Sequence, residues 1–465
     1  MGNLRTKDLS NIGYVNDQLR SLVINTATKY FKHYSKEEIL DLLTKIMNNP
    51  EQFLGDEVTG KIAEKIIGKV DVPIYKSYDL MEEPAPYKVY GAKGIEPIAI
   101  KQMELAMKLP ITVQGALMPD AHMGFGLPIG GVLAATNAVI PYAVGMDIGC
   151  RMALSIVDKT DAFIKRYDYL IKQALRNFTH FGMEGGLEIR QEHEVLDDPL
   201  FQQLAFLKPL RSKAVRQLGS SGGGNHFVEF GEIELAENNS LGLPAKKYTA
   251  LLTHSGSRGL GAAIAKQYTQ IAMNTCKLPR HAQQLAWLDM DSEAGQEYWL
   301  AMTLAGDYAK ACHEKIHGNL LKSLGLKAIH VTENHHNFAW KEVLNGKEVI
   351  VHRKGATPAH KGELGIIPGS MTTPAYLVTG KGVNSAVNSA SHGAGRAMSR
   401  QKAKDNMTVS AMKKLLSNAG VTLLGGSVEE NPLAYKDIES VIKAQSELVN
   451  IEGKFMPKIV KMNKD

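Results

Sequence analysis

Four segments of the sequence each carry side chains of the types that bind divalent metal ions. The segments are "VGMDIGCRM", "GGGNHFVEF", "THSGSRG" and "ENHHNFAW", and their candidate ligands are Asp147, Cys150, His226, His254 and His336. Carboxylate, thiolate and imidazole together suit a borderline ion such as Mn(II) or Zn(II), and one shared thiolate can bridge two ions. Because these ligands come from distant segments, their spacing alone also fits polar loop residues without a metal.

A fifth segment, "SASHGAGRAMSR" (389–400), surrounds His392 with Ser, Ala and Gly and adds Arg396 and Arg400. Small neighbours allow either a tight turn or the close approach of a ligand. The segments "HRKGATPA" and "IIPGSM" offer guanidinium and backbone N–H groups to phosphates. The sequence has neither of the two standard glycine-rich phosphate-binding patterns, so phosphate binding and ordinary solvated turns are both open.

The segment "HEKIH" (His313–His317) matches the H-E-x-x-H pattern of zinc peptidases, with Glu314 as the general base. The same spacing arises by chance on a helix that packs through one face. No third-ligand motif follows closely, which favours the chance interpretation.

Composition places the chain among globular proteins of a reducing compartment. It has three cysteines in 465 residues, no long apolar run and no N-terminal signal peptide, so we expect a cytoplasmic protein outside the membrane. The net charge of +6 permits a polyanionic partner without requiring one.

Two architectures follow one another along the chain. Residues 35–38 ("SKEE") form a predicted capping box, and the apolar residues after it have helical spacing. Prolines in the segment 80–91 predict a linker, so we place a helical N-terminal region at 1–85 and a second domain at 86–465. There, β-rich runs alternate with helices near 161–178 and 293–324, which predicts an α+β fold.

Nine motifs in order resemble the RtcB family of RNA ligases. They are "MPDAHMGFGLPIGG", "VGMDIGC", "LGSSGGGNHFVEF", "HSGSRGLG", "HHNFA", "RKGA", "IIPGSM", "SASHGAGRAMSR" and "AYKDI", and they span roughly residues 86–461. The resemblance implies a large mixed α/β core with β-sheets flanked by helices, preceded here by a small all-helical region.

The resemblance also implies an enzyme and its cosubstrates. It would join RNA ending in a 2′,3′-cyclic phosphate or 3′-phosphate to RNA beginning with a 5′-hydroxyl, in RNA repair or tRNA splicing. GTP and two Mn(II) ions would be needed, and the reaction would pass through histidine–GMP and RNA(3′)pp(5′)G intermediates. His392 would be the nucleophile, and the sequence identifies no protein activator.

Site residues carry over motif by motif. Cys150 would bridge two ions, with Asp147 and His226 completing one site and His254 and His336 the other. Arg353, Arg396 and Arg400 would contact the RNA backbone or pyrophosphate. The residues implied to hold the nucleotide are Asn225, His226, Phe227, Val228, Glu229, His336, Asn337, Pro368, Gly369, Ser370, Met371, His392, Gly393, Ala394, Gly395, Tyr435 and Lys461.

The chain departs from the family pattern at four places. Arg151 follows the bridging cysteine where glycine is usual, and would put a long cation close to the metals. Thr372 replaces a glycine, and Ala375 replaces a serine that often contacts the nucleotide. The usual Lys-Gly end is absent, which makes Lys461 the candidate for contacting guanine, with Lys464 as second choice. A dinuclear-metal phosphodiesterase or hydrolase is the alternative function, followed by a zinc peptidase and a noncatalytic RNA-binding protein.

Overall fold

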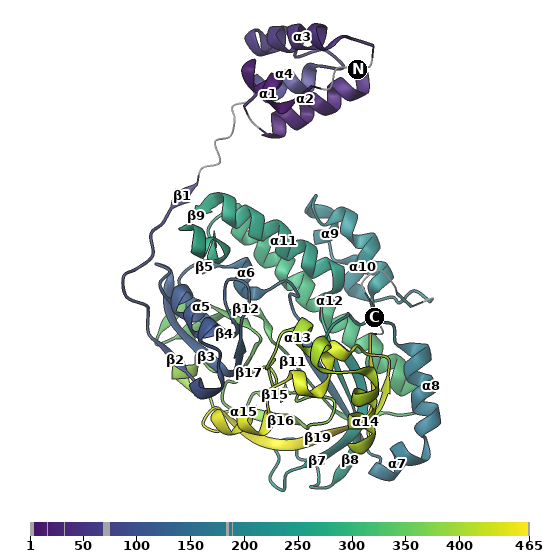
Figure 1. Cartoon of the computed structure of the whole chain (residues 1–465). Helices are drawn as coiled ribbons and strands as arrows, with labels where there is room; N and C mark the ends of the chain where they lie inside the picture. The colour runs from purple at the N-terminus through teal and green to yellow at the C-terminus, as the bar shows by residue number, and fades with distance from the viewer. Residues whose placement is uncertain are drawn as a thin grey trace. The chain divides into compact units, whose positions relative to one another are not determined.

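The chain forms two compact units, Met1–Tyr75 and Lys76–Asp465, in a computed structural model (Figure 1). The structure describes residues 4–15, 17–31, 33–67, 75–182, 186–187 and 189–463. The candidate Lys464 lies outside the described residues.

The first unit is helical, as its apolar spacing predicts. The predicted capping box is confirmed: the Glu38 backbone N–H donates to Ser35 Oγ (3.2 Å) and the Ser35 N–H donates to Glu38 Oε2 (2.7 Å). Ile39, Leu43 and Ile46 are buried in a core that belongs to this unit alone. Its elements are α1 (Thr6–Asn11), α2 (Asp17–Tyr30), α3 (Lys36–Asn48), η1 (Pro50–Phe53) and α4 (Gly60–Ile67).

The segment 76–91 belongs to the second unit. Its strand β1 (Lys76–Ser77) pairs with β9 (Cys276–Lys277), and β2 (Tyr87–Val89) pairs with β3 (Thr112–His122). Between them the Ala85 N–H donates to the Met107 carbonyl (2.8 Å). The prolines interrupt the helical pattern without detaching the chain, so the structural division falls between Tyr75 and Lys76 rather than near residue 85.

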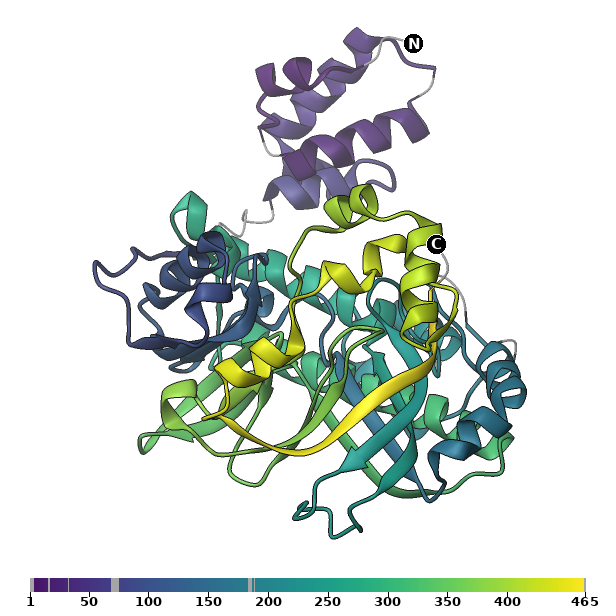
Figure 2. The ribbon, with the colours of Figure 1, turned by 60° about the horizontal axis from the view of Figure 1, so that its bottom comes forward.

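The largest sheet of the second unit has eight strands among the described residues. Neighbours on its main path are antiparallel, and β19, the long yellow strand of Figure 2, lies between β7 and β16. The path runs β11 (Ala328–His335), β6 (Arg151–Val157), β8 (Lys247–Ser255), β7 (Phe227–Leu235), β19 (Val449–Met462), β16 (Ala375–Gly380) and β15 (Leu364–Ile367), with β18 (Thr422–Leu424) parallel to β19.

A second sheet of five strands and two short strand pairs complete the β structure of the described residues. The five-stranded order is β12 (Asn337–Leu344), β13 (Lys347–Lys354), β4 (Ile129–Ala135), β3 and β2. The short pairs are β10 (Leu288–Asp289) with β5 (Ala138–Val139) and β14 (Ala356–Pro358) with β17 (Ser389–Ser391).

Helices flank these sheets, which confirms the predicted α+β class. The longest, α12 (Glu293–Ser323), contacts β6 and β8 and packs beside α11 (Arg258–Thr275). The other α-helices are α5 (Pro97–Met107), α6 (Pro141–Val144), α7 (Asp161–Arg166), α8 (Asp168–Phe178), α9 (Leu200–Gln203), α10 (Arg211–Gln217), α13 (Arg400–Asn406), α14 (Val409–Asn418) and α15 (Ile438–Ala444). The short 3-10 helices are η2 (Ala92–Gly94), η3 (Glu194–Asp197), η4 (Lys208–Leu210), η5 (Arg280–Leu285), η6 (Asn384–Ala386), η7 (Val428–Glu430) and η8 (Pro432–Ala434).

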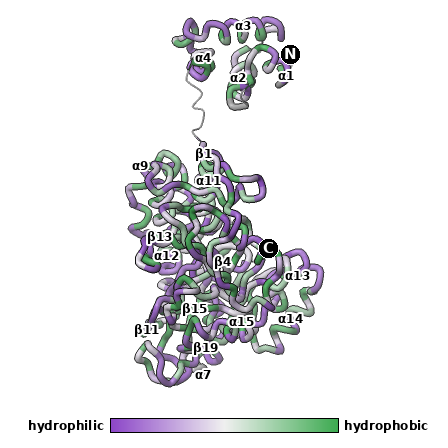
Figure 3. The backbone as a smooth tube through the Cα atoms, turned by 90° about the vertical axis from the view of Figure 1, so that its left-hand side faces the viewer, coloured by the Kyte–Doolittle hydropathy of each residue, from purple (hydrophilic) through white to green (hydrophobic). Residues whose placement is uncertain are grey.

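Hydrophobic and hydrophilic residues are interleaved along the chain (Figure 3). Within the described ranges, no helix combines the length and the apolar character that crossing a bilayer requires.

Candidate active site

The five candidate metal ligands meet at one end of the eight-stranded sheet. Cys150 immediately precedes β6, His226 precedes β7, His254 is the second-last residue of β8, and His336 follows β11. Since β6 is antiparallel to both β8 and β11, and β7 is antiparallel to β8, the starts of two strands lie beside the ends of the other two. Residues as distant in the chain as Cys150 and His336 are thereby brought together.

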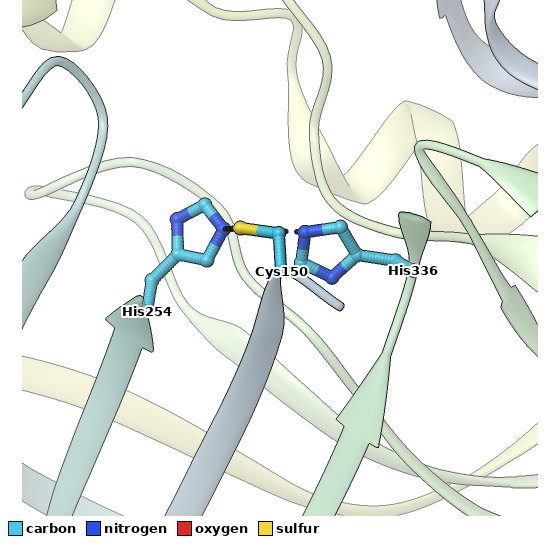
Figure 4. A group of neighbouring side chains, drawn as sticks. All are labelled: Cys150, His254 and His336. Carbon is cyan, nitrogen blue, oxygen red and sulfur yellow. Dashed lines mark hydrogen bonds between the residues drawn. The ribbon is translucent and has the colours of Figure 1, made fainter. Parts of the chain in front are cut away.

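Two groups of these side chains share Cys150. In the first, Cys150, His254 and His336 have ligand atoms within 4.8 Å of one another, and the same holds for Asp147, Cys150 and His226. Cys150 Sγ lies 3.2 Å from His254 Nε2 and 3.4 Å from His226 Nε2. Figure 4 shows Cys150 between the rings of His254 and His336. A thiolate at this position can contact two ions at once.

The free ring nitrogens fit metal ligation. His254 Nδ1 lies 3.1 Å from the Asn225 carbonyl oxygen, an acceptor that directs a proton to Nδ1 and leaves Nε2 as the ligand atom. That Nε2 is 3.2 Å from His336 Nε2, and His336 Nδ1 is buried with no hydrogen-bond partner. Buried polar atoms without partners are rare, and a divalent cation would satisfy this set of donors.

Burial favours the neutral imidazoles of His254 and His336, the form that ligation requires. Burial lowers the pKa of His254 to about 3 and that of His336 well below its ordinary value. Burial also raises the pKa of the Cys150 thiol, so without a cation the sulfur keeps its proton. For Asp147, burial acts to raise the pKa, but the hydrogen bond and charge of His226 outweigh it and lower the pKa to about 2.

His392 lies beside this cluster and is held by a carboxylate. Its Nδ1 is 2.7 Å from Oδ2 of Asp120, and its ring centroid is 5.0 Å from that of His336. The same oxygen accepts from the backbone N–H groups of His392 (3.2 Å) and Gly393 (3.3 Å). Asp120 is fully buried on β3. With its proton on Nδ1, the imidazole has its lone pair on Nε2.

A cavity of about 260 Å³ joins these residues to most of the implied nucleotide ligands. Burial raises the pKa of Glu229 within it, which favours the protonated carboxyl over the carboxylate. The implied nucleotide residues that line the cavity are Asn225, His226, Phe227, Glu229, His336, Asn337, Pro368, Gly369, Ser370, Met371, His392, Gly393, Ala394, Gly395 and Tyr435.

The side chains of Val228 and Lys461 lie elsewhere because strand side chains alternate between faces. Val228 is buried in the core on the opposite face of β7 from Phe227 and Glu229. Lys461 Nζ donates to the carbonyl oxygens of Leu175 (2.7 Å) and Thr179 (2.9 Å), while the next residue of β19, Met462, lines the cavity. Lys461 therefore does not extend into this cavity.

The structure corrects two expectations about arginine side chains, namely that Arg353 contacts RNA and that Arg151 lies close to the metals. Arg353 is fully buried, with Nη1 2.5 Å from Glu342 Oε1, so it is a structural residue and no RNA contact. Arg151 pairs across the sheet with Ser255, whereas Met152 pairs with His254. The Arg151 side chain thus lies on the face opposite His254, where it contacts Glu333 (3.1 Å) and His335 (3.1 Å) instead of approaching the metal ligands.

Two further cationic residues and one further departure line the cavity, and Thr372 lies in a neighbouring turn. Arg396 and Arg400 line it, and Arg396 Nη1 is 3.0 Å from Glu430 Oε2, which also accepts from the Tyr435 hydroxyl. Ala375 lines the cavity as well. The Thr372 N–H donates to Ser370 Oγ (3.4 Å) in the turn that follows β15.

Sequence reasoning missed Asp120, His122 and Glu430. All three adjoin the site: His122 and Glu430 line the cavity, and Asp120 binds His392. Asp120 and His392 are 272 residues apart, so no spacing links them. The only available signal is the position of Asp120 inside the quoted "MPDAHMGFG" motif.

The two histidines of the HEKIH segment lie on the buried side of α12, where they pack against β8. His313 Nδ1 and His317 Nε2 lie 2.6 and 2.8 Å from Thr253 Oγ1, and both rings are buried. Glu314 lies apart from them on an exposed side, 2.9 Å from His193. In the described part of the chain, the clusters of metal-binding side chains are the two that share Cys150, and neither contains these histidines.

Thr253→Val is expected to lower the free energy of unfolding by about 1–3 kcal/mol, because it leaves two buried imidazoles without their shared partner. Urea denaturation followed by circular dichroism measures this change. The matched control is Thr303→Val, since Thr303 is exposed on α12 and bonds only to the Trp299 carbonyl. Equal losses in both variants would contradict a role for the buried network.

A family model and individual relatives of known name point to the same protein family. A family model described as tRNA-splicing ligase RtcB matches residues 102–206 and 201–462. RNA-splicing ligase RtcB of Escherichia coli (strain K12) is 32% identical over 414 residues, covering 81% of this chain and 97% of that protein. tRNA-splicing ligase RtcB of Nanoarchaeum equitans is 32% identical over 464 residues, covering 84% and 95% respectively. The match leaves the first helical unit outside the family region.

Proposed function

Because this chain belongs to the RtcB family and is an RNA ligase, we propose that it joins RNA ending in a 2′,3′-cyclic phosphate or 3′-phosphate to RNA beginning with a 5′-hydroxyl. GTP and Mn(II) would be required, and RNA repair or tRNA splicing would be its role. One observation carries this proposal: His392, oriented by Asp120, shares a cavity with five metal-binding side chains. Nucleotidyl transfer needs such a nucleophile beside groups that hold phosphate charge.

His392 would begin the reaction. Its Nε2 attacks the α-phosphorus of GTP, an N–P bond forms, and pyrophosphate leaves with the electrons of the broken P–O bond. Asp120 keeps the Nδ1 proton in place and stabilises the positive charge that the ring acquires. Gly393 and Ala394 next to the nucleophile leave space for the nucleotide.

Two further transfers would complete ligation. An oxygen of the RNA 3′-phosphate attacks the phosphorus of the histidine–GMP, releasing His392 and forming RNA(3′)pp(5′)G. The 5′-hydroxyl of the second RNA then displaces GMP, losing its proton as the 3′,5′-phosphodiester forms. A 2′,3′-cyclic phosphate must first be opened by water to give the 3′-phosphate.

The donor set supports two divalent cations. Asp147, Cys150 and His226 would hold one ion, and Cys150, His254 and His336 the other. When bound, the ions would neutralise phosphate charge and make the phosphorus atoms more electrophilic. A thiolate with imidazoles also suits Zn(II), which we expect to compete with Mn(II) for these sites.

The guanosine nucleotide would occupy the cavity beside His392. Its proposed contacts come from the turn 368–371, the segment 392–395, and the start of β7, with Val228 contributing only through its backbone. Asn337 and Tyr435 complete the set. Arg396 and Arg400, which line the same cavity, would bind pyrophosphate or the RNA backbone.

An RNA ligation assay tests the proposal. Two RNAs, one with a labelled 3′-phosphate and one with a 5′-hydroxyl, are incubated with the protein, Mn(II) and GTP. The expected product is a longer RNA whose labelled phosphate resists phosphatase because it lies in the new junction. Release of labelled inorganic phosphate without a joined product would contradict the proposal and support the dinuclear hydrolase.

Asp120→Asn is expected to slow histidine–GMP formation by roughly ten-thousandfold, the scale seen when a His-orienting carboxylate loses its charge. The amide can no longer hold the proton on Nδ1 and stabilise the ring charge. Single-turnover labelling at saturating GTP measures the rate, and an unchanged GTP affinity separates positioning from binding. A rate equal to that of the unaltered protein would contradict this role.

A further inference from the structure

The loop between β3 and β4 carries exposed large apolar side chains. Met123 and Phe125 are 61% and 65% exposed. The residues on either side of this loop, His122 and Ile129, both line the cavity. A largely exposed aromatic ring therefore lies within a few residues of the cavity in the sequence.

The loop that follows α6 carries another exposed apolar side chain. Met146, 42% exposed, directly precedes the metal-ligand candidate Asp147. The Phe125 ring lies edge-on to Tyr142 of α6, with centroids 6.3 Å apart, and α6 leads into this second loop. Lys354 Nζ joins the two segments by donating to the carbonyl oxygens of both Phe125 and Tyr142.

The loop is fixed through its backbone, so its exposed side chains are presented in a defined position. Gln102 binds both polar backbone groups of Gly124, donating to its oxygen (2.6 Å) and accepting from its N–H (3.1 Å). Gln284 accepts from the Gly126 N–H (3.1 Å). With the buried Lys354 holding Phe125, three consecutive residues are anchored by side chains from three other parts of the chain.

Glycines on both sides of Phe125 allow this anchoring. A Cβ at Gly124 would lie 2.8 Å from the Leu127 oxygen, and Gly126 has a φ of +68°. Both positions therefore exclude ordinary side chains. The local sequence keeps the loop close to the protein while projecting the Phe125 ring into solvent, at the cost of exposed apolar surface.

We propose that Phe125, in the loop that also carries Met123, stacks on the terminal base of an RNA strand bound at the cavity. This inference rests on the proposed function, which requires unpaired RNA ends to reach His392. Aromatic stacking is the usual way in which proteins hold unpaired bases, and it tolerates every base because each has a π-face. Neighbouring thioethers favour contact with such rings. Stacking would position the terminal ribose and phosphate beside Asp147 and His392.

Phe125→Ala is expected to raise the KM for one RNA strand about tenfold or more, the effect of losing one base stack, and to leave kcat unchanged. Phe125→Trp restores the ring and keeps a low KM. RNA that lacks the terminal base of that strand should show the same raised KM with the unaltered protein, and Phe125→Ala should add no further loss. Testing each strand with a terminal abasic nucleotide identifies the strand.

Histidine–GMP formation provides the internal standard, because it needs no RNA and should be unchanged in Phe125→Ala. Tyr169→Ala is the matched control, since Tyr169 is 69% exposed on α8. An unchanged KM in Phe125→Ala, or an equal loss with abasic RNA, overturns the stacking inference alone. An unaltered protein that joins no RNA overturns the proposed function and this inference with it.

Discussion

His392→Ala is expected to abolish histidine–GMP formation, and with it the joining of 3′-phosphate RNA, while the protein stays folded. The variant removes the atom that would form the N–P bond, and Asp120 has no nucleophilic nitrogen to take its place. Incubation with Mn(II) and α-labelled GTP, followed by denaturing electrophoresis, measures the adduct. Its bond should be labile to acid and stable to base, as a phosphoramidate is.

The last step of the reaction distinguishes loss of the nucleophile from general damage to the protein. RNA that already carries the 3′-pp-G end needs no histidine, so His392→Ala should still join it to a 5′-hydroxyl RNA. His360→Ala is the control for removing an imidazole, because His360 is a half-exposed residue paired with Glu363 and Glu342 outside the cavity. Labelling of His392→Ala by GTP would show that another residue is the nucleophile.

Cys150→Ala is expected to weaken Mn(II) binding at both sites, whereas loss of His336 or Asp147 should affect mainly one. The sulfur belongs to both ligand groups. Changing an outer hydrogen-bond partner of a metal ligand costs about 10- to 100-fold in affinity, so removing a shared ligand should cost at least about 100-fold. Titration calorimetry and metal analysis of the purified protein give affinity and stoichiometry, and ligation should fall with both.

The matched control for this prediction is Cys276→Ala, a buried cysteine outside the cavity. Burial raises the pKa of the Cys150 thiol, so metal binding must displace a proton, and affinity for Mn(II) should rise as pH rises. The Cys150→Ala variant should lose this part of the pH dependence. Retention of two tightly bound ions by the variant would contradict the bridging role.

Local signals predicted the elements well because they act within a few residues. The capping box at Ser35 and the apolar spacing of α3 are properties of neighbouring positions, and the structure confirms both. The pairing of Asp120 with His392 is different, since it depends on how β3 and β17 pack. No pattern in either segment identifies the partner.

Strand alternation explains the residues whose positions differ from expectation. Motif matching assigns a role to a position without specifying which face of a strand its side chain occupies. Phe227 and Glu229 reach the cavity while Val228 enters the core, and Met462 reaches it while Lys461 turns toward α8. Arg151 likewise lies on the face opposite His254. The exact register of each strand decides these cases, and register depends on the assembled sheet.

The placement of the candidate metal ligands on four strand ends has a consequence for synthesis of the protein. During translation, Asp147, Cys150, His226 and His254 emerge before His336, and the proposed nucleophile His392 emerges later still. A nascent chain therefore lacks a complete second ion site until β11 has paired with β6. Tight binding of two metal ions and consumption of the nucleotide therefore both require the assembled sheet. Catalytic activity in turn indicates that the sheet has formed.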